Sequence, residues 1–438
     1  MIAPGCRRRL CGRAAQAPPK KSTVGSILQT GRARRKPREA RMLEQTTMVR
    51  GTVDRVRFRG ASLEGNALGD PAERELIVYL PPSYGLHADS DLHYPVVMVL
   101  AGFAATNASL LNFKPWEQNL LERYERLIDQ GCGEAILVLP DCFTRLGGSQ
   151  YLDSEAQGNY QRYLAEDVIA YVDAHYRSVP ARESRAIVGK SSGGFGALRM
   201  GMDRPECFAV IASHAGDCGF ELCIRPRFAE SAAVYERCGG QHAFLAQMQK
   251  QGAPRSQAEF HALELLALAH AYAPLAAASG GGGELPFDPY TAQIVPEKWQ
   301  RWLAHDPALR SAAGLRQARL VFLDAGKSDE YGLQFGARIL AERLIESGVA
   351  VDHEEFDGGH MGTAYRYDVS LPKVIAALDP PSNSAHPSSP PQRASSAASL
   401  KRAAPDLRSR AEDPHASAER EASPSPLAME ARTTREPL

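Results

Sequence analysis

The stretch Ala186-Ile-Val-Gly-Lys-Ser-Ser-Gly-Gly-Phe-Gly196 combines a buried strand, a sharp turn and the start of a helix. Its first three residues form a short apolar run, which suits a parallel strand buried on both faces. The apolar residues at 195, 198 and 202 then recur at helical spacing. Between the two patterns lies Gly189-Lys-Ser-Ser-Gly193, a G-x-S-x-G sequence that places a serine on a tight strand-to-helix turn.

Ser191 is the candidate nucleophile of this turn. The glycines two residues before and after it let the strand and the helix approach closely, and the strained backbone exposes the serine hydroxyl. The N-terminus of the following helix offers free backbone N–H groups that can stabilise an oxyanion. A G-x-S-x-G sequence also occurs in structural turns, so the assignment depends on partners further along the chain.

Strands and helices alternate on both sides of this turn. Besides an edge region at 53–58, further strands are predicted at 75–80, 94–100, 135–139, 207–212, 318–323 and 349–356. Helices are predicted at 116–128, 164–175, 195–202, 333–344 and 371–378. This alternation predicts an α/β fold with a mostly parallel central sheet and helices on both faces. Active groups are expected at the carboxyl ends of the strands.

Composition divides the chain into three parts. Residues 1–47 form a basic tail, 48–378 one α/β domain, and 379–438 a polar tail that cannot bury a core and is expected to be disordered. Within the domain, residues 219–300 break the strand–helix rhythm and predict a helical cap insert above the serine. The insert could supply substrate walls, with Trp299 among them, or serve as plain packing or as a homodimer interface.

Charge and cysteine content exclude several classes of protein. The formal net charge is +0 and the pI is near neutral, so no nucleic-acid or membrane partner is expected. Residues 1–41 hold a dozen Lys and Arg; an inert tail is expected, with a basic arm or a transit peptide as alternatives. The chain has no signal-type or membrane-length apolar run, so a cytoplasmic location is expected. The 8 cysteines lack zinc spacing and are expected to be reduced, and no metal or organic cofactor is needed.

A histidine and an acid follow in the order that serine catalysis requires. His360 comes directly after the last predicted strand, in Asp357-Gly-Gly-His360, and can act as a general base. The candidate acids are Asp217, Asp324, Asp329 and Glu330. Asp329 is favoured because it lies in a loop, whereas Asp324 ends a strand and is expected to accept backbone N–H groups of the turn. The chain order of serine, acid and histidine is that of α/β-hydrolase triads.

Several short motifs together resemble one family. They are Val78-Tyr-Leu-Pro-Pro82, Tyr151-Leu-Asp-Ser154, Asp173-Ala-His-Tyr-Arg177, Gly189-Lys-Ser-Ser-Gly-Gly194, Gly326-Lys-Ser-Asp329 and Asp357-Gly-Gly-His360. This set is similar to the putative-esterase family of α/β hydrolases, which includes esterase D (S-formylglutathione hydrolase), enterochelin and feruloyl esterases and mycolyl transferases. The resemblance covers residues 70–378. It implies an α/β-hydrolase fold, the triad Ser191, Asp329 and His360, and oxyanion donors at the N–H groups of Phe103 and Ser192.

The chain departs from the family pattern at two positions. Ala101-Gly102 stands where many members have His-Gly, and Lys190 stands where His or Tyr often precedes the nucleophile. The first change keeps the backbone donors. The second places a cation near the serine, where it could favour an acidic acyl or leaving group or point into solvent. Gly102, Lys190, Asp217 and Trp299 are therefore further candidates for substrate binding.

These features predict a serine carboxylesterase that acts on a small-molecule ester or thioester through an acyl-enzyme on Ser191. An acyltransferase of the same fold, which passes the acyl group to an alcohol or sugar, is an alternative. A non-catalytic binding protein is an alternative of a different class.

Overall fold

An eight-stranded sheet forms the centre of the computed structural model, which describes residues 50–86, 91–275 and 282–381. Its strands run in the order β1-β2-β4-β3-β7-β8-β9-β10. The strands are β1 (Thr52–Arg59), β2 (Glu73–Leu80), β3 (Val96–Leu100), β4 (Ile136–Pro140), β7 (Arg185–Lys190), β8 (Val210–His214), β9 (Leu320–Gly326) and β10 (Val351–Phe356). β1 with β2 and β2 with β4 are antiparallel, and every other pair in this sheet is parallel. The predicted mostly parallel sheet is confirmed.

Twelve α-helices and several shorter elements surround the sheet in the described part of the chain. The α-helices are α2 (Pro82–Leu86), α3 (Leu120–Asp129), α4 (Tyr160–Arg162), α5 (Ile169–His175), α6 (Ser192–Asp203), α7 (Phe220–Cys223), α8 (Phe228–Cys238), α9 (Gln241–Gln251), α10 (Gln257–Tyr272), α11 (Pro296–Leu303), α12 (Leu333–Glu346) and α13 (Tyr367–Ala376). The shorter elements are the 3₁₀ turns η1 (Ala61–Leu63), η2 (Asn107–Leu111), η4 (Arg182–Ser184), η5 (Arg225–Arg227), η7 (Leu315–Gln317) and η8 (Ala364–Arg366), the π-helical turn η3 (Tyr163–Val168), and the two-stranded ribbon β5 (Asp153–Ser154) and β6 (Gly158–Asn159).

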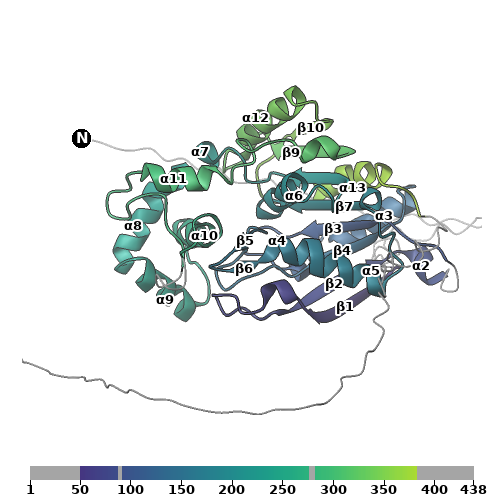
Figure 1. Cartoon of the computed structure of the whole chain (residues 1–438), viewed down its shortest axis with the longest axis horizontal. Coiled ribbons are helices and arrows are strands. Elements are labelled where there is room, and N and C mark those ends of the chain that lie inside the picture. The colour runs from purple at the N-terminus through teal and green to yellow at the C-terminus, as the bar shows by residue number, and fades with distance from the viewer. Residues whose placement is uncertain (1–49, 87–90, 276–281, 382–438) are drawn as a thin grey trace, which may run out of the picture. The chain divides into compact units, whose positions relative to one another are not determined.

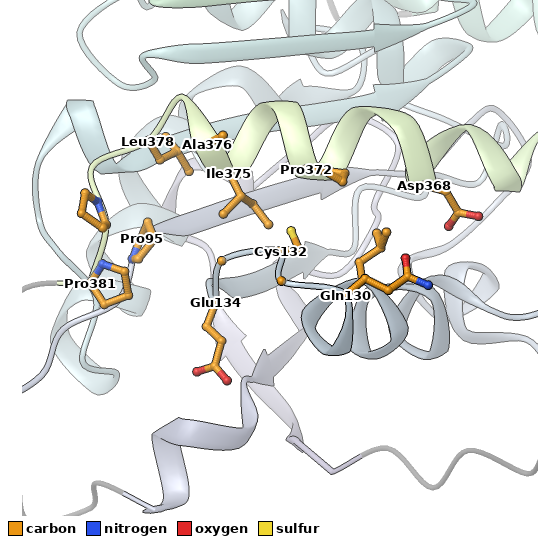
Figure 2. Close-up of a pocket in the computed structure, with 14 residues that line it drawn as sticks. Pro95, Gln130, Cys132, Glu134, Asp368, Pro372, Ile375, Ala376, Leu378 and Pro381 are labelled. Atoms are coloured by element: carbon orange, nitrogen blue, oxygen red, sulfur yellow. The ribbon is translucent and has the colours of Figure 1, made fainter.

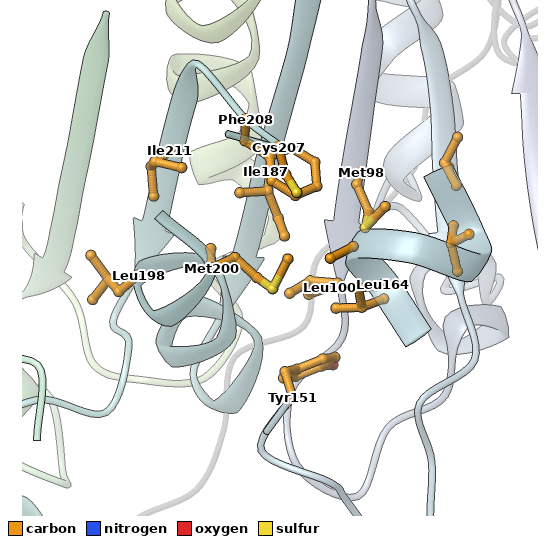
Figure 3. Packing of buried hydrophobic residues seen from close by; sticks show 14 of the residues in the cluster. Met98, Leu100, Tyr151, Leu164, Ile187, Leu198, Met200, Cys207, Phe208 and Ile211 are labelled. Atoms are coloured by element: carbon orange, nitrogen blue, oxygen red, sulfur yellow. The ribbon is translucent and has the colours of Figure 1, made fainter. Parts of the chain in front are cut away.

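Apolar side chains bury both faces of the sheet. On one face, α6, α12 and the η3–α5 segment cover a cluster that includes Met98, Ile187, Leu198 and Met200 (Figure 3). On the other face, α3 and α13 cover the alternate residues of the same strands, with Val188 of β7 among them. β7 is therefore buried on both sides until its last residue. This burial holds the strand rigidly below the turn that carries Ser191.

The insert between β8 and β9 is built mainly of helices. Helices α8 to α11 gather at one side of the sheet, on the left of Figure 1. They share an apolar core that includes Phe228, Trp299 and Trp302. α10 has ten buried residues out of 16, in agreement with the nearly all-round apolar pattern of its sequence. Phe195 of α6 joins the same core, so the insert packs directly on the helix that follows Ser191.

Most of the predicted tails lie outside the described residues. This applies to all of 1–47 and to 379–438 except residues 379–381. No helix among the described residues is long and apolar enough to cross a membrane. The described cysteines are all free.

Candidate active site

Ser191 lies on a strained turn between β7 and α6. Its φ is 57° and its ψ is −124°, a combination that few non-glycine residues adopt. The flanking glycines are required by close backbone contacts. A Cβ at Gly189 would lie 2.2 Å from the carbonyl oxygen of Gly193, and a Cβ at Gly193 would lie 2.4 Å from that of Leu100. The turn therefore has the backbone geometry of a nucleophile elbow.

The loop after β3 lies against this elbow. A Cβ at Gly102 would lie 3.4 Å from the Lys190 carbonyl oxygen and 3.6 Å from Ser191 Cβ. The Ser191 N–H donates to the carbonyl of His214 at 2.9 Å, which ties the turn to the end of β8. Gly102 thus packs against the turn that carries the serine.

His360 and Asp329 form a buried hydrogen-bonded pair. His360 Nδ1 lies 2.8 Å from Asp329 Oδ2, and the two side chains are 6% and 0% exposed. Asp329 Oδ1 accepts the N–H of Tyr331 at 2.9 Å, and the Tyr331 ring meets the His360 ring edge-on at 4.8 Å. Glu330 instead accepts the backbone N–H of His360 at 2.6 Å. Of the four candidate acids, Asp329 is the one that contacts the imidazole of His360.

Backbone contacts join the loops that carry this pair. Both loops leave neighbouring parallel strands, β9 and β10. The Ser328 N–H donates to the carbonyl of Gly358 at 3.0 Å, and the Lys327 N–H donates to that of Phe356 at 2.9 Å. A Cβ at Gly326 would lie 2.4 Å from the Gly358 carbonyl oxygen, so only glycine allows this approach.

Asp324 belongs to a different network. Its Oδ1 lies 2.7 Å from His214 Nδ1, and its Oδ2 accepts from Arg366 Nε at 2.7 Å. His214 Nε2 lies 2.9 Å from Ser370 Oγ, which makes a second Ser–His–Asp relay inside the fold. Ser370 is fully buried and Asp324 is 1% exposed. The expectation that Asp324 accepts backbone N–H groups was wrong, because its two carboxylate oxygens contact the side chains of His214 in β8 and Arg366 in η8.

A cavity of about 610 Å³ opens above the elbow. Both Ser191 and His360 line it, together with Gly102, Phe103, Lys190 and Asp217 from the predicted set. The remaining lining residues are Leu100, Ala101, Ala105, Ser109, Leu110, Asn112, Lys114, Arg227, Gln257, Phe260, Glu264, Tyr331, Met361, Gly362, Thr363, Ala364 and Tyr367. The cavity therefore joins the serine and the imidazole to one space large enough for a small ligand.

Asp329 lies behind His360 and does not line the cavity, and two other predicted residues also lie outside this lining. Ser192 is buried as the first residue of α6, with its hydroxyl donating to the side-chain carbonyl of Gln150. Trp299 is buried in the core of the insert, where its Nε1 donates to Glu221 at 2.7 Å. The hydroxyl of Ser192 is thus paired with Gln150, and only its backbone N–H remains as a candidate oxyanion donor. Trp299 is a packing residue of the insert in this structure.

The insert side of the cavity carries polar groups that local sequence patterns did not indicate. Arg227 and Glu264 form a buried ion pair, and the Arg227 guanidinium lies 4.7 Å from the centre of the Tyr331 ring. Gln150 Nε2 donates to Asp217 Oδ2 at 3.0 Å. Burial raises the pKa of Asp217 to about 6, with a further contribution from Glu264. These contacts join residues 67 and 37 positions apart, so they leave no signal at short spacing.

A second cavity, of about 650 Å³, lies near the amino ends of β3 and β4 (Figure 2). Pro95, Cys132, Glu134 and Ile375 are among its lining residues. Burial raises the pKa of the Cys132 thiol to about 11, so the thiol stays protonated and unreactive at neutral pH. The described residues also contain no group of three or more His, Cys, Asp and Glu side chains that could hold a metal. The space above Ser191 is therefore the candidate active site.

The sheet order and the elbow define an α/β hydrolase. The model of the putative esterase family matches residues 66–374, and the chain belongs to this family. It is therefore an ester hydrolase by family. No curated protein matches the sequence significantly.

Several solved structures are similar in fold. A ferulic acid esterase is 18% identical, with 75% of this chain and 99% of that chain covered and a TM-score of 0.48. An S-formylglutathione hydrolase from Agrobacterium tumefaciens is 17% identical, with 76% and 98% covered and a TM-score of 0.46. A ferulic acid esterase from Anaeromyces mucronatus is 19% identical, with 75% and 92% covered and a TM-score of 0.46.

Proposed function

We propose that this protein is a serine carboxylesterase that hydrolyses an ester or thioester through an acyl-enzyme on Ser191. The observation that carries the proposal is the position of Ser191 on a strained elbow in the same cavity as His360, whose imidazole is paired with the buried Asp329. In this proposal Ser191 is the nucleophile, His360 the general base and Asp329 the acid that orients the imidazole.

The reaction proceeds by two displacements. His360 Nε2 takes the hydroxyl proton while Ser191 Oγ attacks the carbonyl carbon, and the tetrahedral intermediate expels the alcohol or thiol, which leaves with that proton. Water then attacks the acyl-enzyme and gives a proton to the same nitrogen. Collapse of the second intermediate returns the proton to Ser191 Oγ and releases the carboxylic acid. The hydrogen bond from His360 Nδ1 to Asp329 keeps Nε2 free to accept the proton in both steps.

Backbone N–H groups of Phe103 and Ser192 serve as the oxyanion donors. Ser192 is the first residue of α6, where the N–H groups of the first turn have no partner within the helix. Phe103 follows Gly102, which approaches Ser191 Cβ, and both residues line the cavity. Donors of this kind stabilise charge that develops only in the transition state.

A fluorophosphonate probe and a panel of esters test the proposal. Aryl esters of increasing acyl length and one thioester should be hydrolysed, and the probe should label Ser191 covalently. A protein that is folded but neither labelled nor active on any member of the panel would be a non-catalytic binding protein, and the proposal would be wrong. Faster transfer to an added alcohol than to water would replace the hydrolase with an acyltransferase.

A further inference from the structure

Lys190 brings an unpaired positive charge into the candidate active site. It is the last residue of β7, directly before Ser191, and it lines the same cavity. Its ammonium forms no ion pair or hydrogen bond with another residue in the described parts of the chain. Burial lowers its pKa, because the charged form loses hydration that the more distant carboxylates replace only in part. An anion at this position would compensate the charge.

The nearby carboxylates already have partners. Asp329 accepts from His360, and Glu330 accepts from the backbone N–H of the same histidine. Asp324 contacts His214 and Arg366 in the buried relay. These three acids act on Lys190 only through space, without a direct contact. A rearrangement that paired one of them with Lys190 would break an existing buried hydrogen bond, which is unfavourable.

A second cation of the cavity lining lies near Lys190. Lys114 lines the cavity and lies close enough to Lys190 to lower its pKa further. Its ion pair with Glu117, at 3.3 Å, is solvent-exposed on both sides and therefore weak. Asn112 and Ser109, which are close to Lys114 in the sequence, also line the cavity and offer neutral hydrogen-bond donors. Lys190 thus has no acid in direct contact and Lys114 has only this exposed partner, so both ammonium groups are available to attract an anion.

The lining residues that come from the segment between β8 and β9 have a different charge balance. There Arg227 is neutralised by Glu264 in a buried ion pair, and Asp217 adds an acidic group. The ammonium group that has no acid in direct contact thus belongs to Lys190 of β7 and not to the insert. An anionic substrate group would favour Lys190 and avoid Asp217.

We propose that Lys190, assisted by Lys114, binds a carboxylate of the substrate, and that this enzyme prefers esters or thioesters with a carboxylate near the scissile bond. The inference rests on the proposed esterase function and adds the charge of its substrate. Lys190 contacts the substrate in this proposal and sets specificity, while Ser191, His360 and Asp329 perform the chemistry.

Matched pairs of aryl esters test the inference. The first pair is the 4-nitrophenyl monoester of succinic acid and that of succinamic acid, which differ by a carboxylate and an amide on the acyl side. The second pair is 4-carboxyphenyl and 4-carbamoylphenyl acetate, with the same difference on the leaving group. In at least one pair we expect kcat/KM to be higher for the carboxylate by about 10- to 100-fold, the range of a hydrogen bond to a charged group.

Variants of Lys190 assign the preference to this residue. Lys190→Met should bring the ratio of the two kcat/KM values close to one, and Lys190→Arg should retain most of it, because the charge remains. Lys298→Gln is the matched control, since Lys298 is ion-paired with Glu284 on the insert and lies outside the cavity lining. If Lys190→Met does not fold, Lys114→Gln carries the test and should lower the ratio by about threefold.

Two results would overturn the inference. One is wild-type turnover without a preference for the carboxylate in either pair, and the other is a preference that survives Lys190→Met. In both cases the esterase function itself would stand, since the neutral esters would still be hydrolysed. A wild-type protein that hydrolyses no ester and is not labelled by a fluorophosphonate would refute the esterase function together with the inference.

Discussion

Replacement of Asp329 by Asn should inactivate the enzyme without unfolding it. Asn keeps the size of the side chain but removes the charge that faces His360 Nδ1 at 2.8 Å. The amide can also donate to Nδ1, which places the imidazole proton on Nε2 and blocks proton transfer from Ser191. Both effects act on the transition state, where the imidazole becomes positively charged.

The magnitude follows from the burial of the pair. The side chains of Asp329 and His360 are 0% and 6% exposed, so solvent screens their interaction poorly. Two unit charges about 4 Å apart attract by about 4 kcal/mol at an effective dielectric constant of about 20. At about 1.4 kcal/mol per tenfold change, the loss of this attraction lowers kcat by about 10³.

Asp324→Asn is the matched control. It removes a carboxylate of the same chemistry, 1% exposed, from the network with His214 and Arg366. The loss of charge beside a buried arginine should destabilise the fold by about 2–4 kcal/mol, with little change in kcat for the folded fraction. Initial rates on an aryl ester and thermal melts followed by circular dichroism measure both effects. A fully active Asp329→Asn enzyme beside a folded but inactive Asp324→Asn enzyme would refute the assignment of the acid.

Three further predictions concern the serine, the elbow and the pH dependence of stability. Ser191→Ala should abolish fluorophosphonate labelling and lower kcat by at least about 10³. Ser370→Ala should leave labelling intact, because Ser370 is fully buried. Labelling that disappeared only in Ser370→Ala would contradict the assignment of the nucleophile. Gly193→Ala should destroy activity or folding, because the new Cβ would lie 2.4 Å from a backbone carbonyl oxygen. Gly85→Ala is the control: no atom lies within 4 Å of its new Cβ, so it should be neutral in thermal melts and rate assays. An active Gly193→Ala enzyme would refute the close packing of the elbow. Asp217→Asn should raise the free energy of unfolding at pH 8 but not at pH 3, because the pKa of Asp217 is raised from 3.8 to about 6 in the fold. The stabilising contribution of the Asp217 carboxyl group is complete below pH 3.8 and is lost as the pH rises through 6. This shift of about two units corresponds to up to about 3 kcal/mol, and denaturant unfolding at both pH values would show an equal effect if the carboxylate were not desolvated.

The central strands could be predicted from the sequence because burial on both faces leaves continuous apolar runs. Their boundaries were less accurate. The run at 207–212 predicted a strand there, whereas β8 spans Val210–His214. Cys207, Phe208 and Ala209 are buried as well, so hydrophobicity alone does not mark where pairing with β7 begins. The helix predicted at 164–175 begins as a π-helical turn, η3, which apolar spacing does not reveal.

The candidate site was predictable where chemistry is local to a motif. The G-x-S-x-G turn and the glycines before His360 can be recognised from their local composition. The structure places Ser191 and His360 at one cavity. The surroundings of Asp217 could not be predicted, because its partner Gln150 lies 67 residues away. The contacts of Asp324 were missed for the same reason. Side chains from distant elements meet only after the sheet has formed.

The joined loops of β9 and β10 have a consequence for how the enzyme loses activity. β10 is the last strand of the sheet and only partly buried, whereas β7 lies in the centre. Edge elements open at a lower free energy than central ones. Detachment of β10 would carry His360 away from Ser191 and from Asp329, because Asp329 follows β9, a buried strand that is also paired with β8. We therefore expect reversible heat inactivation below the global melting temperature, with hydrogen exchange rising first in β10.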